Sequence, residues 1–596
     1  MIPALVVFAY LAIVVYIGVF AFRRGKNTGE DFFLASRSLG PYVFILSLFG
    51  TNMTAFAILG SSGLAYQRGI GVYGLMASAS GFVIPLTIFF IGTRLWALGK
   101  KFGHMTQVQY FRDRWECNKT GTLIFLVTAV MLVPYLIIGT MGGGSTLESL
   151  TTITGSDGKP KQFQVYENGQ PKMQPVLVQQ TSVDGKPLHR YKLNPAGNAV
   201  LDAKGKPVLE LVKAPKLDSD GKPVTAPVTE HKHWVPYEVG AAIVALVVMS
   251  YVFFGGMRGT AWVNTFQVVL FLCFGAIAFY LISRKLGGFA QIMQDMAAHP
   301  RTLALLQRDR IPMAEFFSYT FIPLSAIMFP HIAIMCMTAE KITHFKKTVI
   351  FYPICIAAIW LPSVYLGVIA AQKMPGLIGG DTNDVIPRML LEMTGPMMAG
   401  VLGAGIMACV MASDSQILAL CTMFTEDIFA HYGGKQRFGE KAQIWTGRAF
   451  IVLVTVIAYV IGVKLKDEEG IFELAIRFNF SGFAALAPIM LAALFWKRST
   501  KYGALAAVLW VAAGMTAMAW LYFRTEGIAP LPGQPAVPIF PALGNLLLRT
   551  PGNVTVFGYL PVMPMTIIAG ILVVVVSLVT PGPSQKTIEK YFPKKP

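Results

Sequence analysis

Apolar residues run along the chain in long blocks separated by short polar stretches. Each block holds about 20 residues, which is enough for a helix to cross a hydrocarbon layer of ~30 Å. The pattern predicts an all-α polytopic membrane protein with about thirteen transmembrane helices, embedded in a lipid bilayer. The expected spans are 3–22, 42–65, 72–96, 122–150, 235–255, 260–283, 314–338, 348–372, 395–428, 449–463, 471–496, 502–523 and 554–580.

Residues 151–233 break this pattern, because they are polar and rich in turn sequences such as Asp157-Gly158 and Asn168-Gly169. These dipeptides favour tight hairpin turns, since glycine takes a positive φ at little cost. Short Val- and Leu-rich runs separate the turns. We predict a small extracytoplasmic β-rich insert with a β-meander, and a disordered insert is the alternative. The insert divides the chain into spans 1–4 (1–150) and spans 5–13 with a short tail (234–596).

The composition excludes a soluble enzyme and a nucleic-acid binder, because 54% of the residues are hydrophobic and only 14% are charged. The excess of 50 Lys and Arg over 31 Asp and Glu is therefore interpreted as membrane topology, since positive residues gather in cytoplasmic loops. No metalloprotease, phosphate-loop or nucleophile motif occurs in the chain. We therefore expect no enzymatic activity and no cofactor.

The basic residues also predict the orientation of the chain in the membrane. Arg23, Arg24 and Lys26 follow the first apolar block, which places the N-terminus outside. The basic tail after the last span is then cytoplasmic. For a bacterial chain, the membrane is the cytoplasmic (inner) membrane.

Four stretches, in this order along the chain, resemble the sodium:solute symporter family. They are 48–54 (Leu-Phe-Gly-Thr-Asn-Met-Thr), 251–267 (beginning Tyr-Val-Phe-Phe-Gly-Gly-Met-Arg), 412–427 (Ala-Ser-Asp-Ser-Gln-Ile-Leu, ending Thr-Glu-Asp) and 495–504 (Phe-Trp-Lys-Arg-Ser-Thr-Lys-Tyr-Gly-Ala). The resemblance implies a leucine-transporter-like fold with a 5+5 inverted repeat. Spans 2–6 and 7–11 would form the two halves, with spans 1, 12 and 13 outside them.

In such a fold the first helix of each half is broken near the middle of the membrane, where its free backbone groups bind solute and ions. Span 2 carries Gly50, Gly60 and Gly63, and span 7 carries Pro323 and Phe329-Pro330-His331. We therefore expect a break in both spans.

The resemblance also implies a sodium site at the first break, with one departure from the family. The carbonyl ligands would be Gly50, Met53 and Ala408. The family's two adjacent hydroxyl ligands fall on Met411 and Ala412, which have no side-chain oxygen.

A displaced cation site is therefore the second expectation. Asn264 stands where some family members have a carboxylate, so a second family site is weakened as well. Asp414 lies inside span 9, one helical turn beyond Met411, and an ionisable residue in a span indicates function. Asp414 with Ser415 and Asn264 is the candidate site, for sodium or for a proton. The alternative is a carboxylate that pairs structurally with a neighbouring helix.

Polar and aromatic residues near the two breaks are candidate solute contacts: Asn52, Thr54, Phe56, Phe329, His331, Arg477 and Asn479. His331 could equally be a buried core residue. Arg477 either extends toward the outer membrane surface or binds a carboxylate, and the second option would favour an anionic or zwitterionic solute over a sugar.

Together these observations predict a secondary active transporter that takes up a small polar organic solute by alternating access. The coupling ion is sodium by resemblance. A transporter-like receptor is one alternative, in which 151–233 binds a ligand or protein partner. A facilitator without ion coupling is the other.

Overall fold

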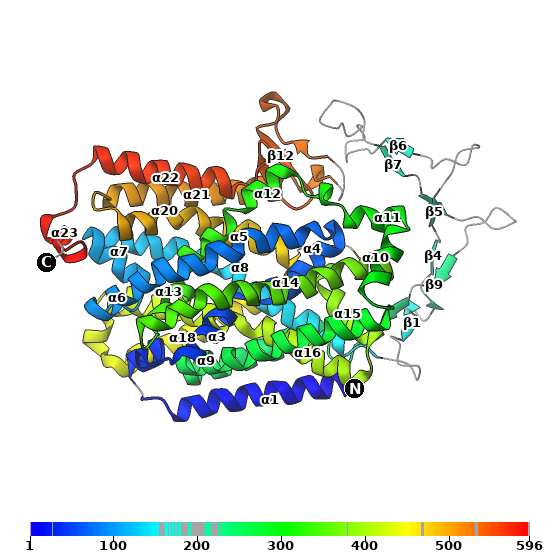
Figure 1. Ribbon diagram of the computed structural model, residues 1–596, viewed down its shortest axis with the longest axis horizontal. Coiled ribbons are helices and arrows are strands. Elements are labelled where there is room, and N and C mark those ends of the chain that lie inside the picture. Colours follow the sequence, from blue (N-terminus) through cyan, green and yellow to red (C-terminus); the bar gives the residue numbers. More distant parts are fainter. Residues whose placement is uncertain are drawn as a thin grey trace. The chain divides into compact units, whose positions relative to one another are not determined.

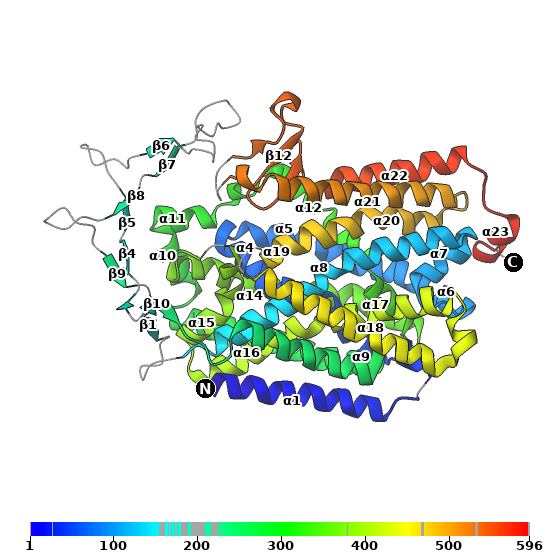
Figure 2. The same ribbon diagram turned by 180° about the vertical axis from the view of Figure 1, so that it is seen from behind.

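The computed structural model describes residues 2–26, 28–153, 232–377, 379–466, 470–530 and 535–593, and also Lys161 and the backbone of ten short strands between 162 and 231. Figures 1 and 2 show a molecule built mainly of helices. The helices are α1 (Ile2–Arg23), α2 (Gly29–Leu34), α3 (Pro41–Asn52), α4 (Ser61–Arg68), α5 (Gly71–Thr87), α6 (Thr93–Phe102), α7 (Gln107–Trp115), α8 (Asn118–Leu150), α9 (Tyr237–Lys285), α10 (Phe289–Ala297), α11 (Pro300–Leu303), α12 (Met313–Tyr319), α13 (Pro330–Met337), α14 (Thr348–Lys373), α15 (Val385–Met393), α16 (Pro396–Val410), α17 (Asp414–Met423), α18 (Gly434–Lys464), α19 (Ile471–Leu474), α20 (Ser481–Phe495), α21 (Lys501–Arg524), α22 (Val562–Val579) and α23 (Gln585–Tyr591).

Short segments of other helix types interrupt or extend these elements. Four π-helical segments continue α-helices within spans: Phe56–Gly60, Ile88–Gly92, Phe424–Ala430 and Ala475–Phe480. Two 3-10 segments that matter below are Ile322–Ile327 and Met411–Ser413. Both π and 3-10 turns inside long helices commonly mark functional positions.

The expected membrane spans are present. Within the described residues, ten helical stretches are long and apolar enough to cross a membrane, and the number is twelve if each of two bent helix pairs is one span. The apolar core extends through these helices and includes residues from Val7 in α1 to Val573 in α22. In both views α1 lies beside α9 and α16, and α22 lies beside α20.

Two expected spans, 235–255 and 260–283, lie within the single element α9. The helix is interrupted at Gly256, which has φ 51° and ψ −145°. A side chain there would be strained, and a Cβ atom would lie 2.5 Å from the carbonyl oxygen of Phe32. Glycine at this position therefore lets α2 approach the interruption in α9 closely.

Both expected helix breaks are confirmed. The pair Pro41–Asn52 and Phe56–Arg68 is bent by 55°, and the pair Met313–Ile327 and Pro330–Met337 by 44°. The glycines of span 2 do not form the first break, which falls at residues 53–55. Gly50 instead allows close packing, because a Cβ there would lie 2.8 Å from a methyl carbon of Val268 in α9.

A second compact unit consists of residues 152–234 and 520–558. Four of the five described strand pairs between 162 and 231 are nested, which differs from the sequential order of the expected meander, and the one pair outside the nested series joins Tyr166–Glu167 to Gln170–Pro171. The turn residues Asp157-Gly158 and Asn168-Gly169 lie outside the described residues. The antiparallel pairs are β1 (Gln162–Gln164) with β10 (Thr229–His231), β2 (Tyr166–Glu167) with β3 (Gln170–Pro171), β4 (Met173–Pro175) with β9 (Thr225–Pro227), β5 (Leu177–Gln179) with β8 (Lys213–Pro215), and β6 (His189–Tyr191) with β7 (Leu209–Leu211).

The same unit contains an antiparallel sheet that the sequence did not predict. Its strands are β11 (Val537–Pro538), β12 (Leu547–Arg549) and β13 (Val554–Val556), in the order β11-β12-β13. The expected span 554–580 therefore begins too early. Its first residues form β13, and the membrane helix α22 begins at Val562.

The C-terminal helix α23 is held against α7 through two carboxylates, Asp113 and Glu116, and Glu116 accepts hydrogen bonds from the Ser584 and Thr587 hydroxyls. Asp113 of α7 accepts hydrogen bonds from the Lys590 ammonium and from the Tyr591 hydroxyl, the latter at 2.5 Å. Burial would raise the pKa of the Asp113 carboxyl, but these bonds outweigh it and hold the pKa below its usual value. Helix α7 also contacts the spans, since the Gln107 amide donates to the Met328 carbonyl at 2.8 Å. The tail is thus linked to the second helix break through α7.

Replacing Gly256 by alanine tests the interruption in α9. Gly256→Ala forces a side chain into a positive φ and against the Phe32 carbonyl, so we expect a loss of roughly 2 kcal/mol or more. The apparent Tm of the purified protein should fall. Gly275→Ala in the same helix is the control, because nothing lies within 4 Å of its added Cβ. Equal Tm values for the two variants would contradict the assigned role.

Replacing Asp113 by alanine tests the attachment of the tail. Asp113→Ala removes the acceptor for Lys590 and Tyr591, so trypsin should cleave the C-terminal helix faster in limited proteolysis followed by mass spectrometry. Glu589→Gln is the control, since the Glu589 carboxylate accepts from Gln585 within the same helix. Unchanged cleavage in Asp113→Ala would show that this carboxylate does not hold the tail.

Candidate functional site

The residues of the expected sodium site lie around the first break, without the hydroxyl pair that the family resemblance implies. Gly50 and Met53 lie at the end of α3, and Ala408 lies near the end of α16. Met411 and Ala412 are fully buried in a 3-10 turn between α16 and α17. Neither has a side-chain oxygen, so this turn offers no hydroxyl pair to an ion.

The structure brings together the three residues of the displaced cation site. The Asn264 amide of α9 donates to the Ser415 hydroxyl at 2.8 Å, and that hydroxyl donates to Asp414 Oδ1 at 3.0 Å. The Tyr251 hydroxyl donates to the other carboxylate oxygen, Oδ2, at 3.0 Å. Asp414 and Asn264 are both 0% exposed, so a buried carboxylate is surrounded by polar side chains from two helices.

A second layer of polar groups extends this network to α1. The Gln267 amide donates to the Tyr10 hydroxyl at 3.1 Å, and that hydroxyl lies 3.8 Å from the Met411 sulfur. Within the described part of the chain, the buried side-chain oxygens of Asn264 and Gln267 accept no hydrogen bond. A buried acceptor without a donor is costly, and a bound cation would satisfy such oxygens.

No ion pair neutralises Asp414 within the described residues. A carboxylate in the membrane interior is expensive unless a cation or a proton compensates it. The described residues also contain no group of three or more His, Cys, Asp or Glu that could hold a metal ion. The side-chain groups around Asp414 are oxygen donors, which suit a hard cation or a proton.

Three of the candidate solute contacts meet in an aromatic cluster between the two breaks. The cluster consists of Phe56, Tyr135, Phe329, His331 and Phe480. The Phe480 ring is the centre of the cluster, with ring centroids 4.9 Å from Phe56, 5.3 Å from Tyr135 and 5.4 Å from Phe329. All five side chains are buried.

The polar candidates differ in what they contact. His331 lies against Phe329, with ring centroids 4.8 Å apart, and its ring nitrogens have no hydrogen-bond partner within the described residues. Asn52 is buried at the end of α3, and Thr54 is buried in the break. The Asn52 carbonyl accepts a hydrogen bond from the Tyr135 hydroxyl at 3.2 Å. These three residues therefore lie in or next to the cluster.

Asn479 and Arg477 lie in the π-helical segment that ends at Phe480. The Asn479 amide donates to the Met131 carbonyl of α8 at 2.7 Å. Arg477 is 8% exposed, with its guanidinium carbon 5.3 Å from the centre of the Phe478 ring. Asn479 thus fixes this segment against α8 next to the cluster.

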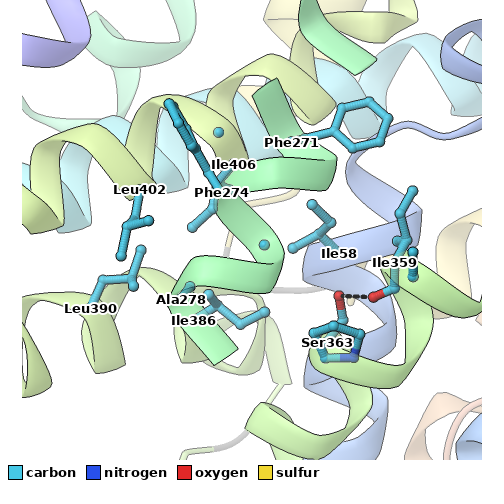
Figure 3. A pocket seen from close by; sticks show the side chains of 14 residues that line it. Ile58, Phe271, Phe274, Ala278, Ile359, Ser363, Ile386, Leu390, Leu402 and Ile406 are labelled. Carbon is cyan, nitrogen blue, oxygen red and sulfur yellow. Dashed lines mark hydrogen bonds between the residues drawn. The ribbon is translucent and has the colours of Figure 1, made fainter. Parts of the chain in front are cut away.

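An apolar pocket lies apart from the cluster, between α9, α14, α15, α16 and the segment Phe56–Gly60 (Figure 3). Phe271, Phe274 and Ile406 are among its lining residues. The Ser363 hydroxyl, which also lines it, donates to the Ile359 carbonyl at 2.8 Å. This lining does not suit a polar solute, so the aromatic cluster remains the candidate solute site.

Comparison with known proteins matches this arrangement to one family. A family model described as the sodium:solute symporter family matches residues 32–155 and 226–510, which is more than half of the chain. The chain belongs to the sodium:solute symporter family. It is therefore an integral membrane protein and a symporter rather than an enzyme, and the predicted family, fold class and transport activity are confirmed.

Individual relatives are distant but match most of the chain. The sodium/proline symporter of Escherichia coli is 22% identical over 556 residues, covering 88% of this chain and 89% of the relative. An uncharacterised symporter of Bacillus subtilis, YhjB, is 22% identical over 546 residues, covering 90% and 91%. A solved structure described as the substrate-bound outward-open state of a Na+-coupled sialic acid symporter has a TM-score of 0.65 and 14% identity, covering 98% of this chain and 99% of that one. At this identity the structure shows a shared fold.

Sequence reasoning missed several residues at the site. Tyr251 lies in a motif that drew attention for other residues, Phe480 directly follows the candidate Asn479, and Tyr135 lies in an apolar span without a marked motif. Gln267 and Gln416 are amides within apolar blocks, and such polar side chains are a usable signal because they need partners there. The Gln416 amide donates to the Thr51 carbonyl next to the first break. The Cys409 thiol contacts the Thr54 carbonyl in the break, but it gave no signal, since a cysteine in an apolar helix usually packs as a small hydrophobic residue.

Proposed function

We propose that this symporter couples uptake of a small polar organic solute to sodium, and that the ion binds at Asp414, Ser415 and Asn264. One observation carries the proposal. The Asp414 carboxylate is fully buried and bonded to Tyr251 and Ser415, while no described cationic side chain pairs with it. Sodium binds oxygen ligands, and Ser415 and Asn264 bring further oxygens to the same carboxylate.

We further propose that the solute binds at the aromatic cluster and carries a carboxylate. The N-terminus of α13 begins at Pro330, between Phe329 and His331 of the cluster. A half-helix N-terminus inside the membrane carries a partial positive charge and favours an anionic group. The apolar part of the solute would then pack against Phe56 and Tyr135. Two of the three named relatives are symporters of proline and of sialic acid, and both solutes have a carboxylate.

The two helix breaks would allow transport by alternating access. In folds of this type, one bundle of helices rocks against the other around a fixed site at the middle of the membrane. The cluster draws on both broken spans and on α8, so movement of the bundle would expose it to each side in turn. An inward sodium gradient would make the direction of net transport inward.

The test is uptake into proteoliposomes of a panel of labelled amino acids, other carboxylates and sugars. Each solute is offered under an inward sodium gradient, an inward proton gradient, or neither. We expect accumulation of a carboxylate-bearing solute under the sodium gradient alone. Accumulation only under the proton gradient would assign Asp414 to a proton, and equilibration without accumulation would indicate a facilitator.

Replacing Asp414 tests the ion site in the same assay. Asp414→Asn keeps the shape of the side chain and removes its charge, so sodium-driven accumulation should fall at least tenfold. Asp309→Asn is the matched control, because Asp309 is exposed outside the membrane spans. Normal accumulation by Asp414→Asn would rule out Asp414 as the ion ligand.

A further inference from the structure

We propose that this chain binds no sodium ion at the first helix break, and that each chain binds one sodium ion in total. The break is the place where the family resemblance puts a sodium site, with Gly50, Met53 and Ala408 as carbonyl ligands. Neutral hydrogen-bond donors hold the break instead. The position of the single remaining ion, at Asp414, rests on the proposed function above.

A helix break inside a membrane creates a specific need. The backbone carbonyls at the break lose their helical donors, and the bilayer offers no water to replace them. A cation can compensate such carbonyls, and so can side-chain donors from neighbouring helices. The residues that face the break decide whether a cation or side-chain donors compensate the carbonyls.

In this chain, every carbonyl from Gly50 to Thr54 accepts a hydrogen bond from the protein. Two of the donors are backbone amides and three are side chains. The bonds are Met53 N to Gly50 O at 3.1 Å, Gln416 Nε2 to Thr51 O at 2.8 Å, Tyr135 Oη to Asn52 O at 3.2 Å, Cys409 Sγ to Met53 O at 3.6 Å, Cys409 Sγ to Thr54 O at 3.1 Å and Ala57 N to Thr54 O at 2.8 Å.

The Cys409 thiol is the donor that bears most directly on the expected site. Its single hydrogen is shared between the Thr54 carbonyl at 3.1 Å and the Met53 carbonyl at 3.6 Å, and the resemblance assigns the Met53 carbonyl to sodium. Cys409 belongs to α16, the helix that would supply Ala408. A thiol hydrogen directed at this oxygen occupies one of its two lone pairs and competes with sodium for the carbonyl. The thiol thus replaces the ion with a neutral contact between the same two spans.

Loss of the thiol contact alone would not restore the site. A thiol is a weak donor, so a cation could compete with it for the Met53 carbonyl. The cation would then lack hydroxyl ligands, because Met411 and Ala412 offer none. Two departures therefore act together, since the ion has lost its side-chain ligands and its carbonyl ligand has gained a protein donor.

The experiment measures equilibrium binding of radiolabelled sodium to the purified full-length protein, with no solute present. We expect one ion per chain with a Hill coefficient of 1, and none in Asp414→Asn. A triple variant, Cys409→Ala with Met411→Ser and Ala412→Ser, restores the family's hydroxyl ligands and removes the thiol. It should bind two ions per chain.

Cys421→Ala is the matched control. Its thiol is also buried in the same span, but it donates to the Gly447 carbonyl at 3.3 Å, away from the break. This variant should bind one ion, as the wild type does. Size-exclusion chromatography of every variant shows whether it is folded and monodisperse.

The outcomes separate this inference from the proposed function. Two ions on the wild-type chain, one of which survives Asp414→Asn, would overturn the inference and leave the Asp414 site standing. One wild-type ion that survives Asp414→Asn would overturn the Asp414 site. No bound ion would overturn the Asp414 site and the total of one ion per chain. A monodisperse triple variant that still binds one ion would contradict the role given to Cys409, Met411 and Ala412.

If the triple variant does not fold, the wild-type and Asp414→Asn measurements still decide the number of ions.

Discussion

A backbone carbonyl inside a membrane needs a donor or a cation, and the centre of this molecule is arranged around that need. The first break exposes carbonyls at the end of α3, and α8, α16 and α17 supply side chains that donate to them. Asp414 follows directly after the 3-10 turn that separates α16 from α17. Its carboxylate is therefore held close to the break by the same span that satisfies the carbonyls.

Most of the architecture could be predicted from the sequence, because the signals are strong. Apolar blocks of span length mark the helices, and Pro330 falls at the second break. Asp414, Ser415 and Asn264 were predicted to lie together, and the structure joins them through hydrogen bonds. A charged or polar side chain in an apolar block stands out, since it needs a partner there.

The remaining features depend on packing, which spacing along the chain does not show. Gly50 was used to predict the first helix break, but in the structure its lack of a side chain allows α3 to pack closely against α9. The Cys409 thiol and the Tyr135 hydroxyl reach backbone carbonyls more than 80 residues away in the sequence. The start of α22 was placed too early, because residues 554–556 are apolar enough for a span yet pair as β13.

The π-helical segments affect any residue-by-residue comparison with a distant relative. A π turn contains one residue more than the α-helical turn it replaces, so it rotates the following residues by about 100° around the helix axis. Phe424–Ala430 and Ala475–Phe480 each introduce such a shift within a span. A relative without the extra residue needs a one-residue gap there for its side chains to face the same neighbours. For Phe480 and the residues of α20, correspondence with a relative that lacks the π turn is therefore correct only if the alignment contains that gap.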